Sequence, residues 1–451
     1  MQFKDKKVLV YGAAKSGISA TGLLRKLEAD IILYDSNTNL KKDNLKDKCN
    51  TDQFTLITGI LPEEIIDTLD LVIISPGVAT DQPDILRIKK KNIPIWGEIE
   101  LAYRISKGKI IGITGTNGKT TTTTLVGELM KTYFPEVYVV GNIGNAYTDI
   151  ALTTSQNSVI VIELSSFQLE TIHKFRPEIS VILNITPDHL DRHYTMDNYI
   201  AMKERITLNQ EESDLCILNY EDESLRALAD RIPARVMFFS SMRRLQEGLY
   251  LEDEDIVFAE HGEKQFICNV KELRVLGKHN YENVMAAVGI AITLGIPIEI
   301  IRKAVVNFQA VEHRIEYVET IGGVTYYNDS KGTNPDASIR AIQAMNSPTI
   351  LIGGGYDKNS SFDDWIKAFD GKVKYLILFG QTREQITRTA LQHGFHNIII
   401  VKDLHEAVKI SAQKAVSGDA VLLSPACASW DMFENFEQRG KIFKEYVREM
   451  L

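Results

Sequence analysis

Short apolar runs alternate along most of this chain with segments whose apolar residues recur every three or four positions. The runs 7–11, 31–34 and 71–74 are mostly apolar, which is typical of strands buried on both faces of a parallel sheet. The segment 18–27 has its apolar residues at helical spacing. This order of strand, helix and strand predicts the opening βαβ unit of a doubly wound α/β domain.

The same alternation begins twice more along the chain. Strands are expected at 110–113, 135–140, 159–163 and 179–183, and then at 324–327, 349–352, 375–379 and 420–423. Between about 236 and 276, short alternating segments with glycine and charge clusters predict a β-ribbon. We therefore predict an α/β protein of three domains. These are an N-terminal Rossmann-like domain (1–97), a central P-loop ATPase-like domain with a small β-ribbon (98–311), and a C-terminal Rossmann-like parallel sheet (312–451).

The length and composition of the chain indicate several domains and disfavour some classes of binding partner. A chain of 451 residues is too long for one ordinary core. A net charge of -9 argues against nucleic-acid and membrane surfaces, because most of the exterior would repel them. The four cysteines are scattered without CxxC spacing, which fits reduced thiols. A strand begins within a few residues of the start, and no apolar run reaches membrane-spanning length, so we expect a cytoplasmic protein.

The strongest chemical signal follows the strand at 110–113. It is the segment Gly115-Thr116-Asn117-Gly118-Lys119-Thr120, which leads into a helix. The glycines let backbone N–H groups turn toward an anion, Lys119 can reach terminal phosphates, and the Thr120 hydroxyl can bind Mg²⁺. The usual P-loop glycine six residues before the lysine is replaced by Ile113. An ordinary glycine turn does not explain Gly-Lys-Thr-Thr behind a buried strand, so we predict a nucleoside triphosphate site whose reaction the motif leaves open.

Polar residues follow two further strands of the same unit. Glu163 ends the strand 159–163, where phosphate-loop proteins hold Mg²⁺ with an acidic residue. His189 follows Pro187-Asp188 after the strand 179–183, and its place at a third strand end favours a site over a structural histidine. Lys203 lies in an apolar helical stripe, where the default interpretation is a lysine whose stem is half buried.

The N-terminal unit carries weaker nucleotide signals. Its first turn, Gly12-Ala-Ala-Lys-Ser-Gly17, has Ala14 where the dinucleotide motif GxGxxG requires glycine, so NAD binding is doubtful. A nucleoside diphosphate could still bind there, with Asp35 at the ribose position. Ser75-Pro-Gly77 forms another turn at a strand end. Either turn alone is best explained as an ordinary βα connection.

Several motifs together resemble one family. They are Gly112-x-Thr-Gly-Thr-Asn-Gly-Lys-Thr-Thr, Gly141-Asn-Ile-Gly, Glu163-Leu-Ser-Ser-Phe-Gln-Leu, Asn184-x-Thr-x-Asp-His, Gly277-x-His-Asn-x-x-Asn and Glu312-His-Arg314. In order and spacing they resemble the Mur ligases, ATP-dependent amide-forming enzymes of peptidoglycan synthesis. The segments Asn328–Thr333 and Leu423–Gly440 are similar to family members that add D-glutamate to UDP-N-acetylmuramoyl-L-alanine. The Asp-Asn-Pro-Arg motif of the diamino-acid-adding relatives is absent from the sequence.

The resemblance implies a role for each domain and for individual residues. The first domain would bind the UDP end of the substrate, the second ATP, and the third D-glutamate; a monomer is expected. The UDP contacts would be Ser16, Gly17, Asp35, Ser36, Ser75 and Gly77. The ATP contacts would be Gly115, Thr116, Asn117, Gly118, Lys119, Thr120, Thr121, Asn283, Arg314 and Asp329. D-Glutamate would meet Lys331, Thr333, Asp357, Lys358, Ser429 and Phe436, and Asn142 would lie near the acceptor substrate.

The resemblance also changes the interpretation of Lys203. It matches a family lysine that reacts with CO₂ to give a carbamate, whose oxygens suit Mg²⁺. Two Mg²⁺ sites are implied, with Thr120, Glu163, His189 and carbamylated Lys203 as ligands, and Lys119, Asn142, His189 and Lys203 as the catalytic set.

Three alternatives stay open on the sequence. A folylpolyglutamate or cyanophycin-type ligase shares the ATPase core, although the first domain and residues 424–440 disfavour it. A nicotinamide oxidoreductase would leave the phosphate loop without a role. A nucleotide-gated interaction protein would not need the lysines expected at the glutamate site.

Overall fold

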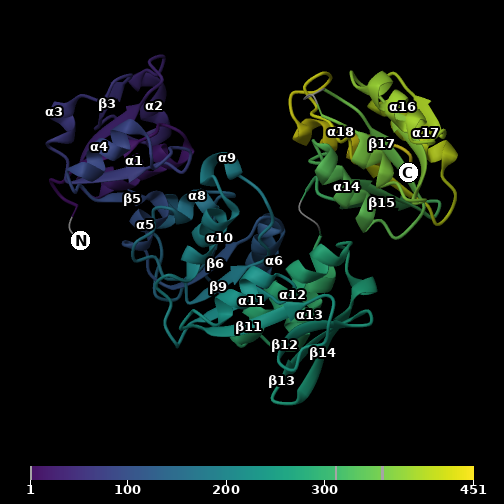
Figure 1. Ribbon diagram of the computed structural model, residues 1–451, viewed down its shortest axis with the longest axis horizontal. Helices are drawn as coiled ribbons and strands as arrows, with labels where there is room; N and C mark the ends of the chain where they lie inside the picture. The colour runs from purple at the N-terminus through teal and green to yellow at the C-terminus, as the bar shows by residue number, and fades with distance from the viewer. Residues whose placement is uncertain (1–2, 310–311, 357–359) are drawn as a thin grey trace. The chain divides into compact units, whose positions relative to one another are not determined.

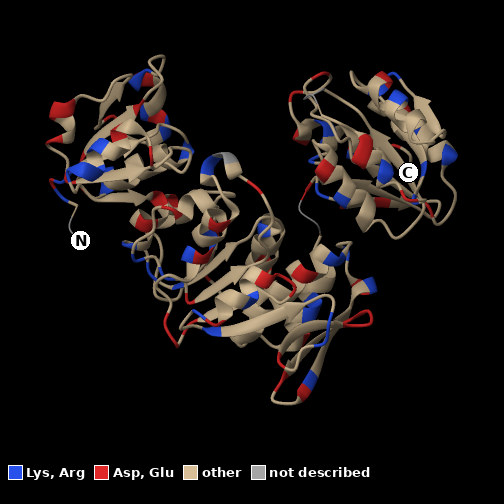
Figure 2. Ribbon diagram, in the orientation of Figure 1, with Lys and Arg blue, Asp and Glu red and all other residues tan. Residues whose placement is uncertain are grey.

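The computed structural model describes residues 3–309, 312–356 and 360–451, which form two compact units (Figure 1). One unit comprises Met1–Cys268 and Glu282–Ala304, and the other comprises Asn269–Tyr281 and Val305–Leu451. The first unit contains two sheets and the second contains one. The predicted α/β architecture with three sheets is confirmed. Figure 2 shows acidic and basic residues interspersed on the helices and loops, while the strands are mostly uncharged.

The first sheet has five parallel strands in the order β3-β2-β1-β4-β5. Because Tyr11 pairs with both Tyr34 and Ile74, the turns after β1, β2 and β4 lie at one edge. Val8 and Val10 pack on the face that α1 covers, and Leu9 and Tyr11 pack on the opposite face with α4. The strands are β1 (Lys7–Tyr11), β2 (Asp30–Asp35), β3 (Thr55–Thr58), β4 (Leu71–Ile74) and β5 (Ile95–Gly97). The helices are α1 (Lys15–Lys26), α2 (Lys42–Cys49), α3 (Glu63–Ile66), α4 (Pro83–Lys90) and α5 (Glu98–Tyr103).

The second sheet has nine strands in the order β14-β13-β12-β11-β10-β9-β6-β8-β7. Strand β6 pairs in parallel with β8 and β9, so Ile113 lies between Glu163 and Val181. The predicted β-ribbon is present, but it is the outer part of this same sheet, where β12 and β13 pair antiparallel. The strands are β6 (Lys109–Thr114), β7 (Val137–Gly141), β8 (Val159–Glu163), β9 (Ile179–Ile182), β10 (Leu215–Asn219), β11 (Arg235–Ser240), β12 (Gly248–Glu252), β13 (Asp255–Glu260) and β14 (Glu263–Asn269).

The loops that leave β6, β8 and β9 therefore share one edge of the second sheet. Short helices follow two of them, while the long helix α6 starts directly behind the glycine loop. The helices of this part of the chain are α6 (Lys119–Lys131), α7 (Tyr147–Ile150), α8 (Ser166–Leu169), α9 (Leu190–His193), α10 (Met196–Glu204), α11 (Glu223–Ala229), α12 (Lys278–Thr293) and α13 (Ile298–Asn307). Two 3₁₀ turns lie at Arg205–Thr207 and Val270–Glu272.

The third sheet has six strands in the order β15-β16-β20-β17-β18-β19. The predicted Rossmann-like parallel sheet is confirmed, and β15 adds an antiparallel edge strand beside β16 that was not predicted. Leu423 pairs with Asn328 and Ile352, which places the loops after β16, β17 and β20 together. The strands are β15 (Glu316–Ile321), β16 (Val324–Asn328), β17 (Thr349–Gly353), β18 (Val373–Leu378), β19 (Ile398–Ile400) and β20 (Ala420–Leu423). The helices are α14 (Pro335–Ala344), α15 (Asp363–Lys367), α16 (Arg383–Gln392), α17 (Leu404–Lys414) and α18 (Phe436–Arg448).

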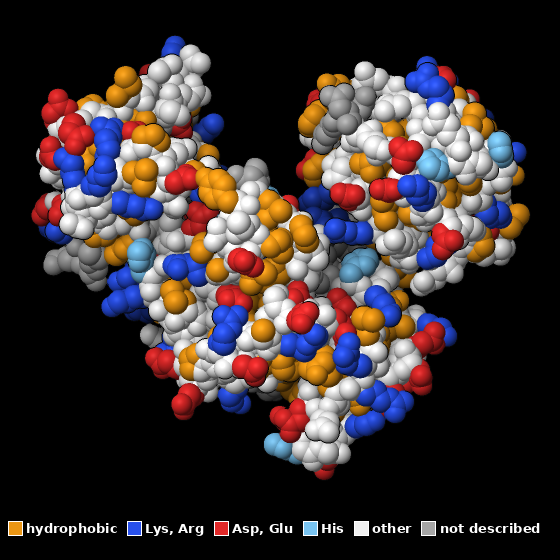
Figure 3. All heavy atoms as spheres, in the orientation of Figure 1, with side chains coloured by type: hydrophobic (Ala, Val, Ile, Leu, Met, Phe, Trp, Pro, Cys, Tyr) orange, Lys and Arg blue, Asp and Glu red, His pale blue; other side chains and the backbone are white. Residues whose placement is uncertain are grey.

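None of the helices in the described part of the chain has the length and apolarity that a membrane span requires. In the space-filling view, exposed apolar side chains are interspersed with charges of both signs (Figure 3).

Candidate functional site

The glycine loop after β6 is built around two positive φ angles. Gly115 has φ +152° and Gly118 has φ +83°, and α6 begins at Lys119. A Cβ on Gly118 would lie 2.2 Å from Oδ1 of Asn283, so this position admits no larger residue without a shift. The Lys119 Nζ donates to the carbonyl oxygens of Gly115 (2.9 Å) and Thr116 (3.0 Å). The lysine therefore curls over its own loop, as a phosphate-binding lysine would.

The loop after β9 is hydrogen-bonded to the glycine loop. The backbone N–H groups of Thr116 and Asn117 donate to the carbonyl and side-chain oxygens of Asn184, each at 2.9 Å. The Thr186 N–H donates to the Thr116 hydroxyl at 3.0 Å. His189 follows in the same segment, and 48% of its side chain is exposed. Because of these bonds, the segment that carries His189 is fixed to the glycine loop at its start.

Glu163 is the last residue of β8, and only one of its two carboxylate oxygens accepts a hydrogen bond from a described residue. Its side chain is buried, and Oε1 accepts a hydrogen bond from the Asn142 amide at 2.8 Å. The Asn142 backbone N–H donates to the Glu163 carbonyl at 2.9 Å, which fixes the loop after β7 against β8. Oε2 is buried and has no hydrogen-bond partner among the described residues. A buried carboxylate oxygen without a donor is unfavourable unless a cation neutralises it, so Glu163 fits a metal ligand.

Lys203 is a buried residue whose side chain reaches the glycine loop. It is the penultimate residue of α10 and is 1% exposed, and its Nζ donates to the Gly115 carbonyl at 2.7 Å. The Nζ also lies 4.7 Å from the centre of the Tyr199 ring. Burial, followed by the positive charge of Lys119, lowers the pKa of Lys203 to about 7. The default interpretation of a half-exposed lysine is therefore wrong, and a large fraction of the amine is neutral near pH 7, the form that reacts with CO₂.

The residues at this edge form an incomplete metal shell. No group of three His, Cys, Asp or Glu side chains gathers closely enough to hold a metal anywhere in residues 3–309, 312–356 and 360–451. Mg²⁺ commonly uses one or two protein carboxylates together with water and substrate phosphates. Glu163 and the Thr120 hydroxyl fit that pattern beside a phosphate loop, and a carbamate on Lys203 would add an anionic ligand.

The turns of the first sheet close tightly on one another. A Cβ on Gly17 would lie 1.8 Å from the Gly12 carbonyl oxygen, and the Ser75 hydroxyl donates to that oxygen at 3.2 Å. Asp35 accepts from the Ala13 N–H at 2.8 Å and from the Asn37 N–H at 2.9 Å. Ser16 and Ser36 lie in the same turns, and the space beside Gly77 is open. The six predicted UDP contacts are thus brought to one edge.

In the second unit, four of the predicted D-glutamate contacts lie on the loops after β16 and β20 and at the start of α18. The Lys331 Nζ lies 5.4 Å from the centre of the Phe436 ring, and the Ser330 hydroxyl donates to the Phe436 carbonyl at 2.9 Å. Ser429 is buried. Thr333 follows on the loop after β16. Two further predicted contacts, Asp357 and Lys358, lie outside the described residues.

Two predicted nucleotide contacts belong to the second unit. Arg314 is exposed, whereas Asp329 is buried. The Asp329 carboxylate accepts from the Ser424 hydroxyl at 2.6 Å and from the Ile315 N–H at 3.3 Å. Burial raises the pKa of Asp329 to about 7. Within its own unit, this carboxylate joins the segment before β15 to the loop after β20.

The sequence interpretation missed Arg439. This side chain is fully buried in α18, and its guanidinium donates to the Ser330 hydroxyl (3.0 Å) and carbonyl (2.8 Å). It also donates to the carbonyls of Cys427 (3.2 Å) and Ala428 (3.3 Å). Burial lowers the pKa of Arg439 to about 10. The available signal was an arginine followed by glycine in an otherwise amphipathic helix, because Gly440 allows close packing: a Cβ there would lie 2.2 Å from His313.

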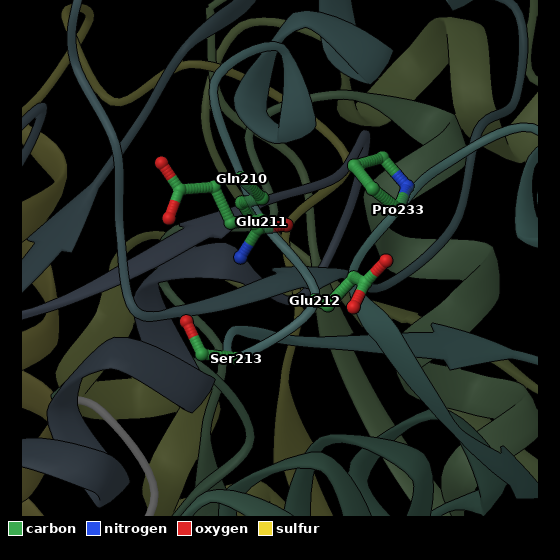
Figure 4. Close-up of a pocket in the computed structure, with 5 residues that line it drawn as sticks. All are labelled: Gln210, Glu211, Glu212, Ser213 and Pro233. Carbon is green, nitrogen blue, oxygen red and sulfur yellow. The ribbon is translucent and has the colours of Figure 1, made fainter.

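A separate cavity of about 410 Å³ lies at the opposite edge of the second sheet, near the start of β10 (Figure 4). It is lined by Gln210, Glu211, Glu212, Ser213 and Pro233. None of these residues was predicted to bind a ligand, and the cavity does not belong to the site described above.

Comparison with known proteins agrees with this arrangement along the whole chain. Residues 6–97 match the model of the Mur ligase MurD-like N-terminal domain, residues 113–291 the Mur ligase middle domain, and residues 313–427 the Mur ligase glutamate ligase domain. A solved structure, UDP-N-acetylmuramate-alanine ligase from Thermotoga maritima, shares the fold with a TM-score of 0.59 and 18% identity. The match covers 99% of this chain and 100% of that chain.

Curated relatives are far more similar in sequence. The UDP-N-acetylmuramoylalanine–D-glutamate ligase of Lachnoclostridium phytofermentans is 58% identical over 448 residues, which cover 99% of both chains. The protein of the same name from Lachnospira eligens is 53% identical over 450 residues, which cover 100% of both chains. This chain therefore belongs to the Mur ligase family.

Proposed function

We propose that this protein is an ATP-dependent ligase that joins D-glutamate to UDP-N-acetylmuramoyl-L-alanine in the cytoplasmic stage of peptidoglycan synthesis. The observation that carries the proposal is the gathering of three groups at one sheet edge. Lys119 curls over the glycine loop, Lys203 is buried against Gly115, and Glu163 has a buried oxygen that accepts no hydrogen bond from any residue the structure describes. The relatives named above, which are at least 53% identical over the full chain, support the same substrates.

The reaction has to convert a carboxylate oxygen into a leaving group. The L-alanine carboxylate of the substrate attacks the γ-phosphoryl group of ATP, and ADP leaves. The D-glutamate amine then attacks the carbonyl of the acyl phosphate, and phosphate leaves as the amide forms. Holding two reactants in this geometry can lower a barrier by about 7 to 11 kcal/mol, which explains why separate binding sites for acceptor and amino acid are useful.

The residues at the sheet edge supply charge and position. Lys119 leaves its own loop carbonyls and binds the transferring phosphoryl group, where a fixed cation stabilises developing charge. Asn142, which Glu163 holds, faces the acceptor carboxylate. Thr120, Glu163, His189 and the Lys203 carbamate would hold Mg²⁺ at two sites, and the metal charge would offset the repulsion between carboxylate and triphosphate.

The carbamate forms from this chain's own lysine. The neutral Lys203 amine adds to CO₂ and loses one proton, which converts a would-be cation into an anion beside the glycine loop. The lowered pKa of Lys203 supports this step, because a fully protonated amine has no lone pair to react.

The three domains divide the substrates. Residues 1–97 bind the uridine diphosphate at the turns of the first sheet, residues 98–311 bind ATP, and residues 312–451 bind D-glutamate. We assign Lys331, Thr333, Ser429 and Phe436 to the amino acid and Asn283 to the nucleotide. The protein works as a monomer in the cytoplasm.

The test is ADP release with ATP, Mg²⁺, UDP-N-acetylmuramoyl-L-alanine and a panel of D- and L-amino acids. We expect release that depends on D-glutamate. Release that is independent of the amino acid contradicts a ligase, and a preference for L-glutamate or for a folate-like acceptor points to a related amide ligase instead.

A further inference from the structure

The short helix α9 connects the segment that carries His189 to a turn of the first sheet. The Arg192 Nη2 donates to the backbone carbonyl of Val78 at 3.0 Å. Two residues further along, the Tyr194 hydroxyl donates to Asp81 at 2.5 Å. Val78 comes directly after the turn Ser75–Gly77, which is one of the two turns assigned to the uridine diphosphate. Both contacts lie within one compact unit.

The Arg192 guanidinium is held in a fixed orientation. Its Nε and Nη2 donate to the two carboxylate oxygens of Glu170 at 3.2 and 2.7 Å. Only 16% of the Arg192 side chain and 10% of the Glu170 side chain are exposed. A two-point contact between a planar guanidinium and a carboxylate fixes direction as well as distance. The position of the Val78 carbonyl is therefore coupled to the plane of this guanidinium.

The Arg192 guanidinium also contacts the Phe167 ring, which in turn contacts the imidazole of His189. The Arg192 Cζ lies 5.1 Å from the centre of the Phe167 ring, and that ring lies 4.9 Å from the imidazole of His189. Phe167 belongs to α8, just after Glu163. These contacts thus form a continuous series from Val78 through Arg192 and Phe167 to His189.

We propose that Arg192 is a positioning residue that couples occupation of the turn Ser75–Gly77 by a nucleoside diphosphate to the orientation of the His189 imidazole. His189 is half exposed, and its backbone is in the left-handed region with φ +51°. Its ring contacts Phe167 at an interplanar angle of 57°, so a change at Arg192 reaches it through that ring contact. The inference rests on the proposed function, because it takes the turn as the uridine diphosphate site and His189 as a catalytic residue.

Nuclear magnetic resonance of ¹⁵N-histidine-labelled full-length protein tests the coupling without turnover. UDP alone is the probe, its affinity is measured by calorimetry, and His189→Gln identifies the His189 signal among the nine histidines. We expect UDP to shift the His189 signal in the wild type. In Arg192→Met the shift is lost, while UDP still binds. Tyr194→Phe should reduce the UDP-induced shift of the His189 signal. Because this change is at an exposed side chain, the variant keeps the test valid if Arg192→Met fails to fold.

Arg176→Met is the matched control. Arg176 makes a two-point contact with Asp214 at 2.7 and 3.1 Å. It also contacts Ser213 at 3.3 Å and Glu211 at 2.8 Å, which line the cavity at the opposite edge of the second sheet from His189. We expect this variant to keep the UDP-induced shift. Arg192→Met should also lower kcat by about 10- to 100-fold, the usual effect of losing a group that orients a metal ligand, with little change in KM for ATP.

Three outcomes contradict the inference. These are a His189 signal that UDP leaves unmoved in the wild type, a shift that persists in Arg192→Met, and a shift that Arg176→Met loses equally. If calorimetry detects no UDP binding in the wild type, the uridine diphosphate assignment itself fails, and the inference fails with it. Binding of UDP without a shift contradicts the coupling alone.

Discussion

The Lys203 Nζ donates a hydrogen bond to the Gly115 carbonyl at 2.7 Å, so a buried amine lies directly against the phosphate loop. Lys203→Ala should remove most of the ligase activity, because an alanine cannot form the carbamate. Added acetate should restore part of it by supplying carboxylate oxygens to Mg²⁺. ADP release measures both effects, and Lys131→Ala, at an exposed lysine in α6, is the control. Full activity of Lys203→Ala without acetate contradicts the carbamate.

The same lysine predicts a pH dependence of stability. Its folded pKa is depressed to about 7 from the ordinary value of 10.5, so the unfolded chain binds more protons between these values. The contribution of Lys203 to the free energy of unfolding therefore increases as pH rises from 7 to 10, by up to about 1.4 kcal/mol per pH unit. Lys203→Met should flatten that part of the profile. Denaturant unfolding in CO₂-free buffer measures it, and parallel profiles for both proteins would show that Lys203 keeps an ordinary pKa.

Glu163 should show opposite effects on stability and activity. Glu163→Gln removes a buried negative charge and leaves an oxygen that can still accept from Asn142. The metal-free variant should be as stable as the wild type or more stable, because functional sites keep unfavourable groups. Its kcat should fall by about 100-fold or more if the loss of one preorganised charge is the guide. Thermal unfolding tests the predicted stability, and ADP release tests the predicted loss of activity. An unchanged kcat would show that Glu163 has no role in the reaction.

Gly118 and Asn283 should be coupled. Gly118→Ala places a Cβ 2.2 Å from the Asn283 Oδ1 at φ +83°. It should destabilise the protein by about 1 to 3 kcal/mol and weaken ATP binding. Asn283→Ala removes the clash but not the backbone strain, so the double variant should lose less stability than the sum of the two single variants. Strict additivity in denaturant unfolding would mean that the two residues do not meet.

Arg439 should hold in place the loops after β16 and β20, which we propose bind D-glutamate. Arg439→Met leaves three carbonyls and the Ser330 hydroxyl without this donor, at a cost of about 1 to 3 kcal/mol per unsatisfied buried group. KM for D-glutamate should rise while KM for ATP stays near its wild-type value. Arg439→Lys should rescue little, since an ammonium cannot span these acceptors. Equal changes in both KM values would indicate general unfolding.

The sequence predicted the parts of this protein that depend on local pattern. The three α/β units follow from apolar runs that end in glycine turns, and the glycine loop before Lys119 was identified from its own residues. β15 was missed because Glu316–Ile321 is not an apolar run and only Val318 in it is buried, whereas a strand buried in a parallel sheet is mostly apolar.

The environment of a side chain could not be predicted in the same way. Lys203 lies on a stripe that fits a half-exposed lysine, and only its burial against Gly115 gives it a depressed pKa. Arg439 and Arg192 donate hydrogen bonds to Ser330 and Val78, respectively, which lie more than 100 residues away along the sequence. Such contacts depend on how whole elements pack, which the periodicity of one segment does not contain.

The most direct test of the central claim follows one oxygen atom. UDP-N-acetylmuramoyl-L-alanine labelled with ¹⁸O in its L-alanine carboxylate is converted with ATP, Mg²⁺ and D-glutamate, and the inorganic phosphate is analysed by mass spectrometry. Attack of the carboxylate on the γ-phosphoryl group predicts one ¹⁸O atom in the phosphate for each amide formed from fully labelled substrate. Phosphate that carries no label would show that water, and not the carboxylate, accepts the phosphoryl group, and it would contradict the account.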